Sequence, residues 1–512
     1  MKNKFKRLLL LLLMIPIRTE AKDVNILDFG AVPDGKTMST DFIQKAIDYC
    51  AATGGGTVTV PNGTYLTNTI YLKSNIDFHL QKNAVILGST LVKEFGNAVV
   101  EGDNIENSSV TGEGVINGQG FMEYYPETGK RHYDLFLYMC RNIKVTNITL
   151  INSPSWTFRI LECNGVIVQG IRINSYANVN NDGIDIDGKN VVITGCIIDS
   201  EDDAICLKSD DPKFLVENVT VSNCVISSIC NAIKFGTSSR CGFKNVSISN
   251  CVIRKPSEGN SYHWSKIQGV SSDTTVISGI SLEIVDGGIM DQIVISNISM
   301  TGIQTPLFIR LGNRNGIGTL KNVIISNIIA KNESMITSSI TGIPGSYVEN
   351  VIVKDIIFNC IGNGSMKEAA ASVPEKEKNY PENRMFGYSL PAYGLYVRHV
   401  NDLILENIHF NLINPDARPA FVFDDCHNIK INGFYAGSQM EGQPLLRLIQ
   451  STNVTLTGYY STYPVALLLH CEGEKSSNIK LLDNDFANVK KIAIFSEGCK
   501  TKAVRELNNF HK

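Results

Sequence analysis

The chain has 512 residues and a formal net charge of −3. So small a charge gives no electrostatic reason to expect a nucleic-acid or anionic-membrane partner, and we expect neither. Glycine is plentiful, with 42 residues, and tryptophan is scarce, with two. This composition favours many short strands and turns over a helical protein.

Residues 1–21 have the features of a secretory signal peptide. A basic start, KNKFKR, is followed by the apolar run LLLLLLMIPI and, at Ala21, by a small residue. The run is too short to span a bilayer, and no later apolar segment is long enough to do so. We therefore expect residues 22–512 to be exported to the periplasm or the extracellular space, with no membrane partner.

Residues 22–75 are expected to form an N-terminal cap and the first coils of the fold. After the phrase NILDFGAVPDGKT, Ser39 or Thr40 can cap a helix over Asp41–Ala52. Four residues would share one face of that helix: Ile43, Ala46, Ile47 and Cys50. An amphipathic helix before a run of strands would cover the first exposed sheet edge.

A ten-residue phrase recurs along the rest of the chain. Its copies include RNIKVTNITL, KNVVITGCII, ENVTVSNCVI, KNVSISNCVI, KNVIISNIIA, ENVIVKDIIF, HNIKINGFYA and TNVTLTGYYS. Asn190, Asn218 and Asn245, one in each of three copies, lie 28 and 27 residues apart. A repeat of this length made of strands and Asn/Gly turns predicts an all-β, right-handed parallel β-helix of roughly ten to twelve coils. Residues 22–512 would form this single domain.

Two columns of the repeat have structural interpretations. Asparagines that tolerate a left-handed backbone should stack in one turn of successive coils, at Asn147, Asn223, Asn250 and Asn327. A neighbouring column should hold buried free thiols, at Cys196, Cys224 and Cys251. Among the thirteen cysteines, Cys230 and Cys241 flank what reads as a short turn and are the best candidates for a disulfide.

Two insertions interrupt the repeat, Lys255–Thr275 and Gly362–Gly394. Long loops on a compact scaffold are usually functional or disordered. The first contains Tyr262, His263 and Trp264, which either stack on sugar rings or anchor the loop itself. We expect both insertions to wall a cleft and to favour the removal of terminal residues or short side chains.

Three aspartates stand in one stretch, which reads NDGIDIDG, a connector and EDDAICLKS. Asp182 precedes one short strand of alternating pattern, and Asp202 and Asp203 precede the next. If these strands stack in parallel, the carboxylates cluster, and mutual repulsion separates their pKa values. One acid can then stay protonated while another acts as a base, as glycoside hydrolysis requires. The alternative is three solvated turn aspartates.

Alternation along the strands IDI, ICL, IKF, SLE and FIR predicts a polar column beside the acids. Its outward members would be Asp185, Cys206, Lys234, Glu283 and Arg310. Lys234 and Arg310 would flank Glu283. Either the column is a structural ladder of ion pairs, or its two cations hold an acidic sugar, with Arg310 the better partner for a carboxylate.

Several of these motifs resemble glycoside hydrolase family 28, the polygalacturonases and their relatives. They are NILDFGAVPDGKT, the β-helix phrase, NSPSWTF, NDG at Asn181–Gly183 and EDD at Glu201–Asp203. The resemblance implies inverting hydrolysis of pectic bonds, although the sequence spacing alone permits either stereochemistry. It also implies that Asp202 is the general acid and that Asp182 and Asp203 activate the water.

Two motifs depart from that family. Where its members carry GHG, this chain has Cys230-Asn231-Ala232, and where they carry RIK it has Ser281-Leu282-Glu283. In polygalacturonases those basic residues resemble a clamp for substrate carboxylates. The substrate-binding candidates here are therefore Asn231, Lys234, Glu283 and Arg310.

The sequence thus predicts a glycosidase that acts on a pectic, galacturonic-acid-containing polysaccharide or oligosaccharide. We expect a monomer without cofactor, and no metal site, because no CxxC pair or histidine cluster has zinc spacing. A polysaccharide lyase that uses the aspartates as Ca²⁺ ligands is the alternative enzyme. A non-catalytic glycan-binding β-helix is the alternative outside catalysis.

Overall fold

The computed structural model describes residues 22–258, 275–437 and 443–512. The predicted signal peptide, residues 1–21, lies outside the described residues. So do Tyr262, His263 and Trp264 of the first insertion.

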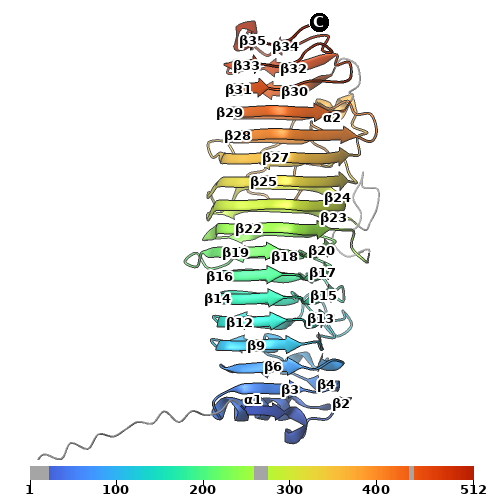
Figure 1. The fold of residues 1–512 in the computed structure, drawn as a ribbon, viewed down its shortest axis with the longest axis vertical. Coiled ribbons are helices and arrows are strands. Elements are labelled where there is room, and N and C mark those ends of the chain that lie inside the picture. Colours follow the sequence, from blue (N-terminus) through green and yellow to red (C-terminus); the bar gives the residue numbers. More distant parts are fainter. Residues whose placement is uncertain (1–21, 259–274, 438–442) are drawn as a thin grey trace, which may run out of the picture.

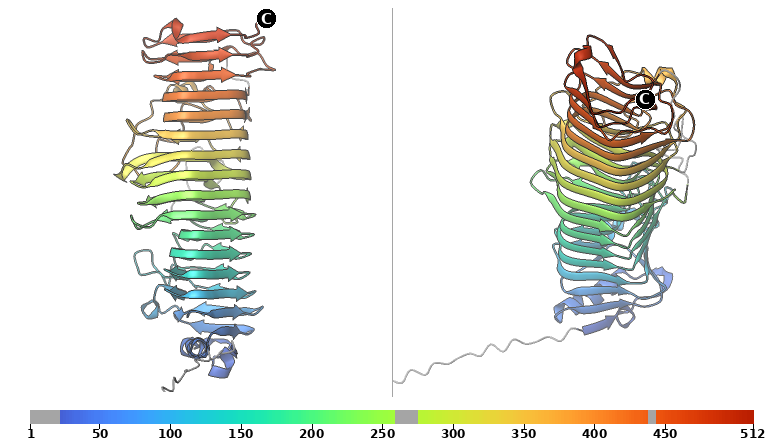
Figure 2. Two further views of the ribbon diagram at one scale, coloured as in Figure 1. Left: turned by 60° about the vertical axis from the view of Figure 1, so that its left-hand side comes forward. Right: turned by 45° about the horizontal axis from the view of Figure 1, so that its top comes forward.

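The described chain is an all-β stack of coils (Figure 1). Strands of successive coils pair in parallel: β14 (Phe158–Gln169) with β16 (Ile184–Thr194), then β16 with β18 (Ile205–Ser209). The ladder continues from β18 to β21 (Asn231–Ser239) and on to β23 (Val276–Asp286). The two views in Figure 2 show the same stacking along the whole length. Each turn of a coil is thereby held directly above its equivalent.

Apolar side chains of the alternating strands fill the interior of the stack. One inward column contains Ile184, Ile205, Ile233, Ile280 and Leu307, which are consecutive register partners and at most 1% exposed. Burying one such side chain fully stabilises the fold by about 1.5–3 kcal/mol. The alternation of the sequence therefore predicted the inward face correctly.

Asparagine ladders hold the turns at the outer edge. Asn250, Asn297 and Asn327 have left-handed φ values of 54° to 57°. Asn297 Nδ2 donates to Asn250 Oδ1 at 3.1 Å, and Asn327 Nδ2 donates to Asn297 Oδ1 at 3.0 Å. Asn147 and Asn223 have the same backbone conformation. The predicted structural column of asparagines is confirmed.

Helix α1 (Thr40–Ala52) lies at the N-terminal end of the stack, beside β1 (Lys22–Asn25) and β3 (Gly56–Val60) (Figure 1). Its buried residues are Ile43, Ala46, Ile47 and Cys50. Ser39 occupies the N-cap position but makes no side-chain capping hydrogen bond. Packing of the apolar face therefore holds this helix in place.

All thirteen cysteines are free, so the predicted Cys230–Cys241 disulfide is wrong. The segment between these residues is not a short turn but the nine-residue strand β21. At about 3.3 Å per residue, that strand separates the two thiols by roughly 30 Å. Cys196, Cys224 and Cys251 are buried free thiols on successive coils, as predicted.

The second insertion, Gly362–Gly394, crosses several coils and is called the strap below. It contains the short helix α2 (Met366–Ala369), which begins with a capping box between Ser365 and Glu368. Arginines of the coils donate to its main-chain carbonyls: Arg310 to Glu375 at 2.9 Å, Arg398 to Val373 at 2.7 Å, Arg447 to Ala369 at 3.2 Å and Arg418 to Leu390 at 3.2 Å. The strap is therefore fixed along its length.

Candidate active site

The three aspartates of the NDG and EDD motifs lie together in stacked turns. Gly183 N donates to Asp203 O at 2.9 Å, which aligns the turn before β16 with the turn before β18. A Cβ on Gly183 would lie 2.3 Å from Ala204 O, so only glycine permits this approach. One carboxylate oxygen each of Asp182 and Asp203 lie within 4.8 Å of each other, as do one each of Asp202 and Asp203.

These carboxylates are buried. Asp182 and Asp203 are 2% exposed and Asp202 is 8% exposed. This placement contradicts the alternative of solvated turn aspartates. Three carboxylates so poorly hydrated require partners for their charge.

The first partner is Lys208, which the sequence analysis missed. Its Nζ lies 3.1 Å from Asp182 Oδ2 and 3.1 Å from Asp185 Oδ1. Burial raises the pKa of Asp182 well above its usual value, and the charge of Asp185 adds to this effect while Lys208 opposes it. Burial alone would lower the pKa of Lys208, but the two carboxylates raise it well above its usual value. The only sequence signal was its outward position in ICLK.

The second partner is Lys234, whose Nζ lies 3.0 Å from Asp203 Oδ2. Asn231 Nδ2 donates to the other oxygen of Asp203 at 2.7 Å. Burial raises the pKa of Asp203, but Lys234, Lys208 and Asn231 together outweigh it, so the pKa falls below its usual value. Asn231 and Lys234 thus lie at the acids, as predicted, and both bind Asp203.

Asp202 has a different environment. Among the described residues it makes no ion pair, and burial followed by the charge of Asp203 raises its pKa. Asn180 Nδ2 donates to Asp202 Oδ2 at 3.3 Å, and Arg131 Nη2 donates to Asn180 Oδ1 at 3.0 Å. Adjacent residues in one turn therefore have pKa values shifted in opposite directions, which suits an acid and a base.

The predicted column from Lys234 through Glu283 to Arg310 is wrong in register. Lys234 pairs with Ser281, and Glu283 pairs with Arg310. Glu283 accepts hydrogen bonds from Ser281 Oγ at 2.7 Å and Thr237 Oγ1 at 3.1 Å. Burial raises its pKa to about 7, against the opposing charge of Lys234.

Arg310 lies beneath the strap and is 1% exposed. Its guanidinium donates to Gly342 O at 2.9 Å, Glu375 O at 2.9 Å and Lys376 O at 3.3 Å. Both terminal nitrogens of the guanidinium therefore already have main-chain acceptors, and the buried side chain offers no accessible face to a sugar carboxylate. The structure thus corrects the prediction that Arg310 contacts the substrate.

Two aromatic residues flank the acids and were not found from sequence. Tyr380 of the strap is 49% exposed, and its hydroxyl lies 3.3 Å from Lys234 Nζ. The Trp156 ring lies 4.4 Å from Lys208 Nζ and stacks on Tyr133 with centroids 5.9 Å apart. Aromatic faces beside these paired carboxyls suit the apolar faces of sugar rings.

In the described part of the chain, two sets of side chains could hold a metal ion by distance alone: Asp182–Asp203–Cys206 and Asp202–Asp203–Cys230. Each offers two carboxylates and a thiol, whereas Ca²⁺ takes six to eight oxygen ligands. The ammonium groups of Lys208 and Lys234 already neutralise the same carboxylates. The donor sets therefore fit a hard cation poorly.

Comparison with known protein families shows which family this site belongs to. The sequence profile of glycosyl hydrolases family 28 matches residues 50–376. The chain belongs to this family. The match includes the acids, Lys208, Lys234, Glu283 and the first part of the strap, and it ends before the last coils.

Individual family 28 relatives agree with this placement. A probable polygalacturonase of Vitis vinifera is 30% identical over 223 residues, which cover 38% of this chain and 45% of the relative. A probable rhamnogalacturonase E of Aspergillus oryzae is 28% identical over 203 residues, covering 39% and 46%. The chain spans about half the length of these curated relatives.

A solved structure supports the fold. The exopolygalacturonase of Thermotoga maritima superposes with a TM-score of 0.61 at 21% identity, over 76% of this chain and 92% of that one. At this identity the likeness concerns the fold alone. No helix in the described part of the chain is both long and apolar enough to cross a membrane.

Proposed function

We propose that the protein is a glycosidase that hydrolyses pectic, galacturonic-acid-containing glycans. The observation that carries this proposal is that two neighbouring buried carboxyls have different partners: Asp203 binds Lys234 and Asn231, whereas Asp202 has no ion pair among the described residues. These surroundings lower the pKa of Asp203 and leave that of Asp202 raised. A protonated carboxyl beside an ionised one is the pair that glycoside hydrolysis needs. Family membership supports the same reaction.

In the proposed mechanism Asp202 donates its proton to the glycosidic oxygen as the bond to the anomeric carbon breaks. Asp203 accepts a proton from the attacking water, and Asp182 orients that water. A single water at about 2.7 Å from each acceptor can bridge oxygens up to about 5.4 Å apart, and the facing oxygens of Asp182 and Asp203 lie within 4.8 Å. Attack by such a water inverts the anomeric configuration.

The candidate binding residues receive revised roles in this proposal. Lys234 and Asn231 keep Asp203 ionised, and Lys234 with Tyr380 forms the wall of the cleft on the C-terminal side of the acids. Glu283, with a pKa of about 7, is a hydrogen-bonding partner at that wall. Arg310 anchors the strap.

We also propose how the strap limits the substrate. It reaches Lys234 from a segment 146 residues further along the chain. Asn313 N donates to Glu377 O at 2.7 Å and Asn383 Nδ2 donates to Ile277 O at 3.0 Å, so both sides of the Tyr380 tip are anchored. A fixed strap on one side of the acids supports the cleavage of terminal residues.

The same proposal includes the handedness of the coils, the extent of the domain, export and the oligomeric state. The coils would wind in a right-handed parallel β-helix, with α1 as the cap of its N-terminal end and residues 22–512 as one domain. Residues 1–21 would direct export, and the mature protein would be a monomer. The parallel pairing of successive coils and the fold likeness support the first of these.

The test is a panel of pectic oligosaccharides incubated with the purified protein in the presence of EDTA. We expect new reducing ends without products that absorb in the near ultraviolet. Ultraviolet-absorbing products that disappear with EDTA would identify a lyase instead. Binding without any turnover would identify a non-catalytic glycan-binding protein.

A further inference from the structure

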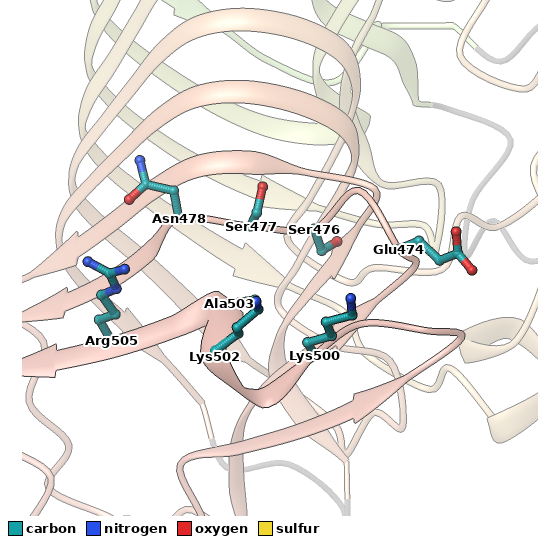
Figure 3. A pocket seen from close by; sticks show the side chains of 8 residues that line it. All are labelled: Glu474, Ser476, Ser477, Asn478, Lys500, Lys502, Ala503 and Arg505. Atoms are coloured by element: carbon teal, nitrogen blue, oxygen red, sulfur yellow. The ribbon is translucent and has the colours of Figure 1, made fainter.

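A second surface of the molecule, in its last coils, has features of a binding site. A hollow of about 540 Å³ lies between the last two coils (Figure 3). It is lined by Glu474, Ser476, Ser477, Asn478, Lys500, Lys502, Ala503 and Arg505. The close-up shows the side chains of Lys500, Lys502 and Arg505 projecting toward the edge formed by Ser476, Ser477 and Asn478.

A second hollow, of about 340 Å³, lies on neighbouring coils. It is lined by Asn350, Asp402, Ile404, Asn428, Lys430, Asn453 and Thr455. The asparagine ladder joins the two hollows, because Asn478 Nδ2 donates to Asn453 Oδ1 at 2.7 Å and Asn453 Nδ2 donates to Asn428 Oδ1 at 2.9 Å. The two hollows follow one another along the stack beside this ladder, and together they are called the groove below.

The groove is rich in cations without partners. Lys500, Lys502 and Arg505 line the first hollow and Lys430 lines the second. Lys480 lies in register between Thr455 of the second hollow and Arg505 of the first, and all five side chains are exposed. Within the described residues none of the five makes an ion pair or a side-chain hydrogen bond. Lys480 and Arg505 are direct register partners on β33 (Ile479–Leu482) and β35 (Val504–Leu507). Like charges directly opposite one another destabilise a sheet, so an anion between them would be stabilising.

This groove is separate from the acids. Asp182 lies just before Ile184, the first residue of β16, whereas the asparagine of the ladder on the same strand is Asn190. The acids and the ladder therefore lie at different corners of the coil. Along the axis, the ladder from Asn190 to Asn478 spans several coils, or roughly 40 Å at about 4.8 Å per coil. The first hollow and all five cations lie beyond residue 376, where the family match ends, whereas Asn350 of the second hollow lies within the match.

We propose that this groove is a non-catalytic binding site for a polyuronate chain. The cations follow the long axis of the stack, as the carboxylates of a linear acidic glycan would, and Asn and Ser side chains line the edge for its hydroxyls. The net charge of −3 makes a cationic groove a local feature rather than a property of the whole surface. The choice of a uronate as ligand rests on the proposed pectic substrate.

The test uses the full chain with Asp202→Asn, so that binding is measured without turnover. Affinity for polygalacturonate is compared between this protein and the same protein carrying Lys480→Gln, Lys502→Gln and Arg505→Gln. We expect the triple variant to lose at least tenfold in affinity and to show a weaker dependence on salt, because fewer charges contact the polymer. The matched control carries Lys36→Gln, Lys82→Gln and Lys144→Gln, three exposed lysines of the first coils.

Unchanged affinity in the groove variant, or an equal loss in the control, would overturn the proposal. In the protein with intact Asp202, the groove variant should hydrolyse short uronate oligosaccharides at the unaltered rate. A loss of that rate would also contradict a separate site. If instead the proposed glycosidase function is wrong, the unsubstituted protein will not hydrolyse the oligosaccharides at all. This result differs from each of the outcomes that would overturn the groove.

Discussion

Lys234 Nζ lies 3.0 Å from Asp203 Oδ2, and both side chains are at most 4% exposed. The pair leaves Asp203 ionised next to Asp202, which has no cation of its own among the described residues. Lys234, with Lys208 and Asn231, thereby distinguishes two adjacent carboxyls of the same residue type.

The first prediction concerns these two acids. Asp202→Asn and Asp203→Asn should each lower kcat by about 10²–10⁴-fold, because each removes a proton donor or acceptor. Initial rates on a pectic oligosaccharide measure the effect, and circular dichroism with a thermal melt checks the fold. Asp211→Asn, a half-buried aspartate two residues after the end of β18, is the control. Rates near those of the unsubstituted protein would remove the acids from the mechanism.

The second prediction concerns Lys234. Lys234→Met removes the charge that lowers the pKa of Asp203, so that pKa should rise. The base would then be protonated over a wider range of acidic pH. The acid limb of the kcat/KM profile should therefore move to higher pH, while Lys213→Met, an exposed change, should leave it in place. An unmoved limb would show that Lys234 does not set the state of the base.

The third prediction concerns Glu283 and stability. Its pKa is raised from 4.5 to about 7 in the folded protein, so the folded state favours the protonated form. The contribution of Glu283 to the free energy of unfolding is therefore fully present below about pH 4.5. It is lost as the pH rises through about 7, and the loss is ~3 kcal/mol at most. Urea unfolding at pH 4.5 and pH 8 should show this loss. Glu283→Gln should show a smaller one, and equal losses would refute the assignment.

The fourth prediction concerns Tyr380. Tyr380→Ala should raise KM about tenfold or more with little change in Tm, because the side chain is half exposed and faces the acids. Tyr388→Ala is a matched control, since Tyr388 is 52% exposed on the same strap. Equal effects of the two substitutions would show that Tyr380 has no special part in binding.

The fifth prediction concerns the anchor of the strap. Arg310→Ala leaves the carbonyls of Gly342 and Glu375 without their donor, so Tm should fall, by the equivalent of about 1–3 kcal/mol. A loosened strap should also admit internal cuts and give a ladder of product sizes at early times. Lys378→Ala, at the exposed tip, should keep the original product pattern. A normal Tm together with weak substrate binding would restore the direct role first predicted for Arg310.

Comparison of these residues shows what the sequence could predict. The alternation of apolar and polar residues along the strands correctly predicts the inward side chains, which include Ile205, Leu207, Ile233 and Phe235. The repeat correctly aligns the NDG and EDD turns on successive coils. Alternation identifies the outward face but not which of two outward positions is in register. Ser281 and Glu283 satisfy it equally, so the partner of Lys234 was chosen wrongly.

The local sequence pattern could not predict which side chains are buried or which contacts join distant segments. Lys208 lies on the strand that follows the acids, yet nothing local indicates that it binds two carboxylates. Tyr380 reaches Lys234 across 146 residues, by a path that depends on Arg310 and Asn383. Neither the length nor the composition of the strap predicts the route by which it reaches Lys234.

The anchoring of the strap has a consequence for how specificity can change over evolution. Arg310, Arg398, Arg418 and Arg447 all bind main-chain carbonyls of the strap. Every residue type supplies such a carbonyl, so most side chains of the strap are free to vary while its route over the coils is kept. New residues at the tip could thus be tried against new sugars without rebuilding the catalytic turns beneath.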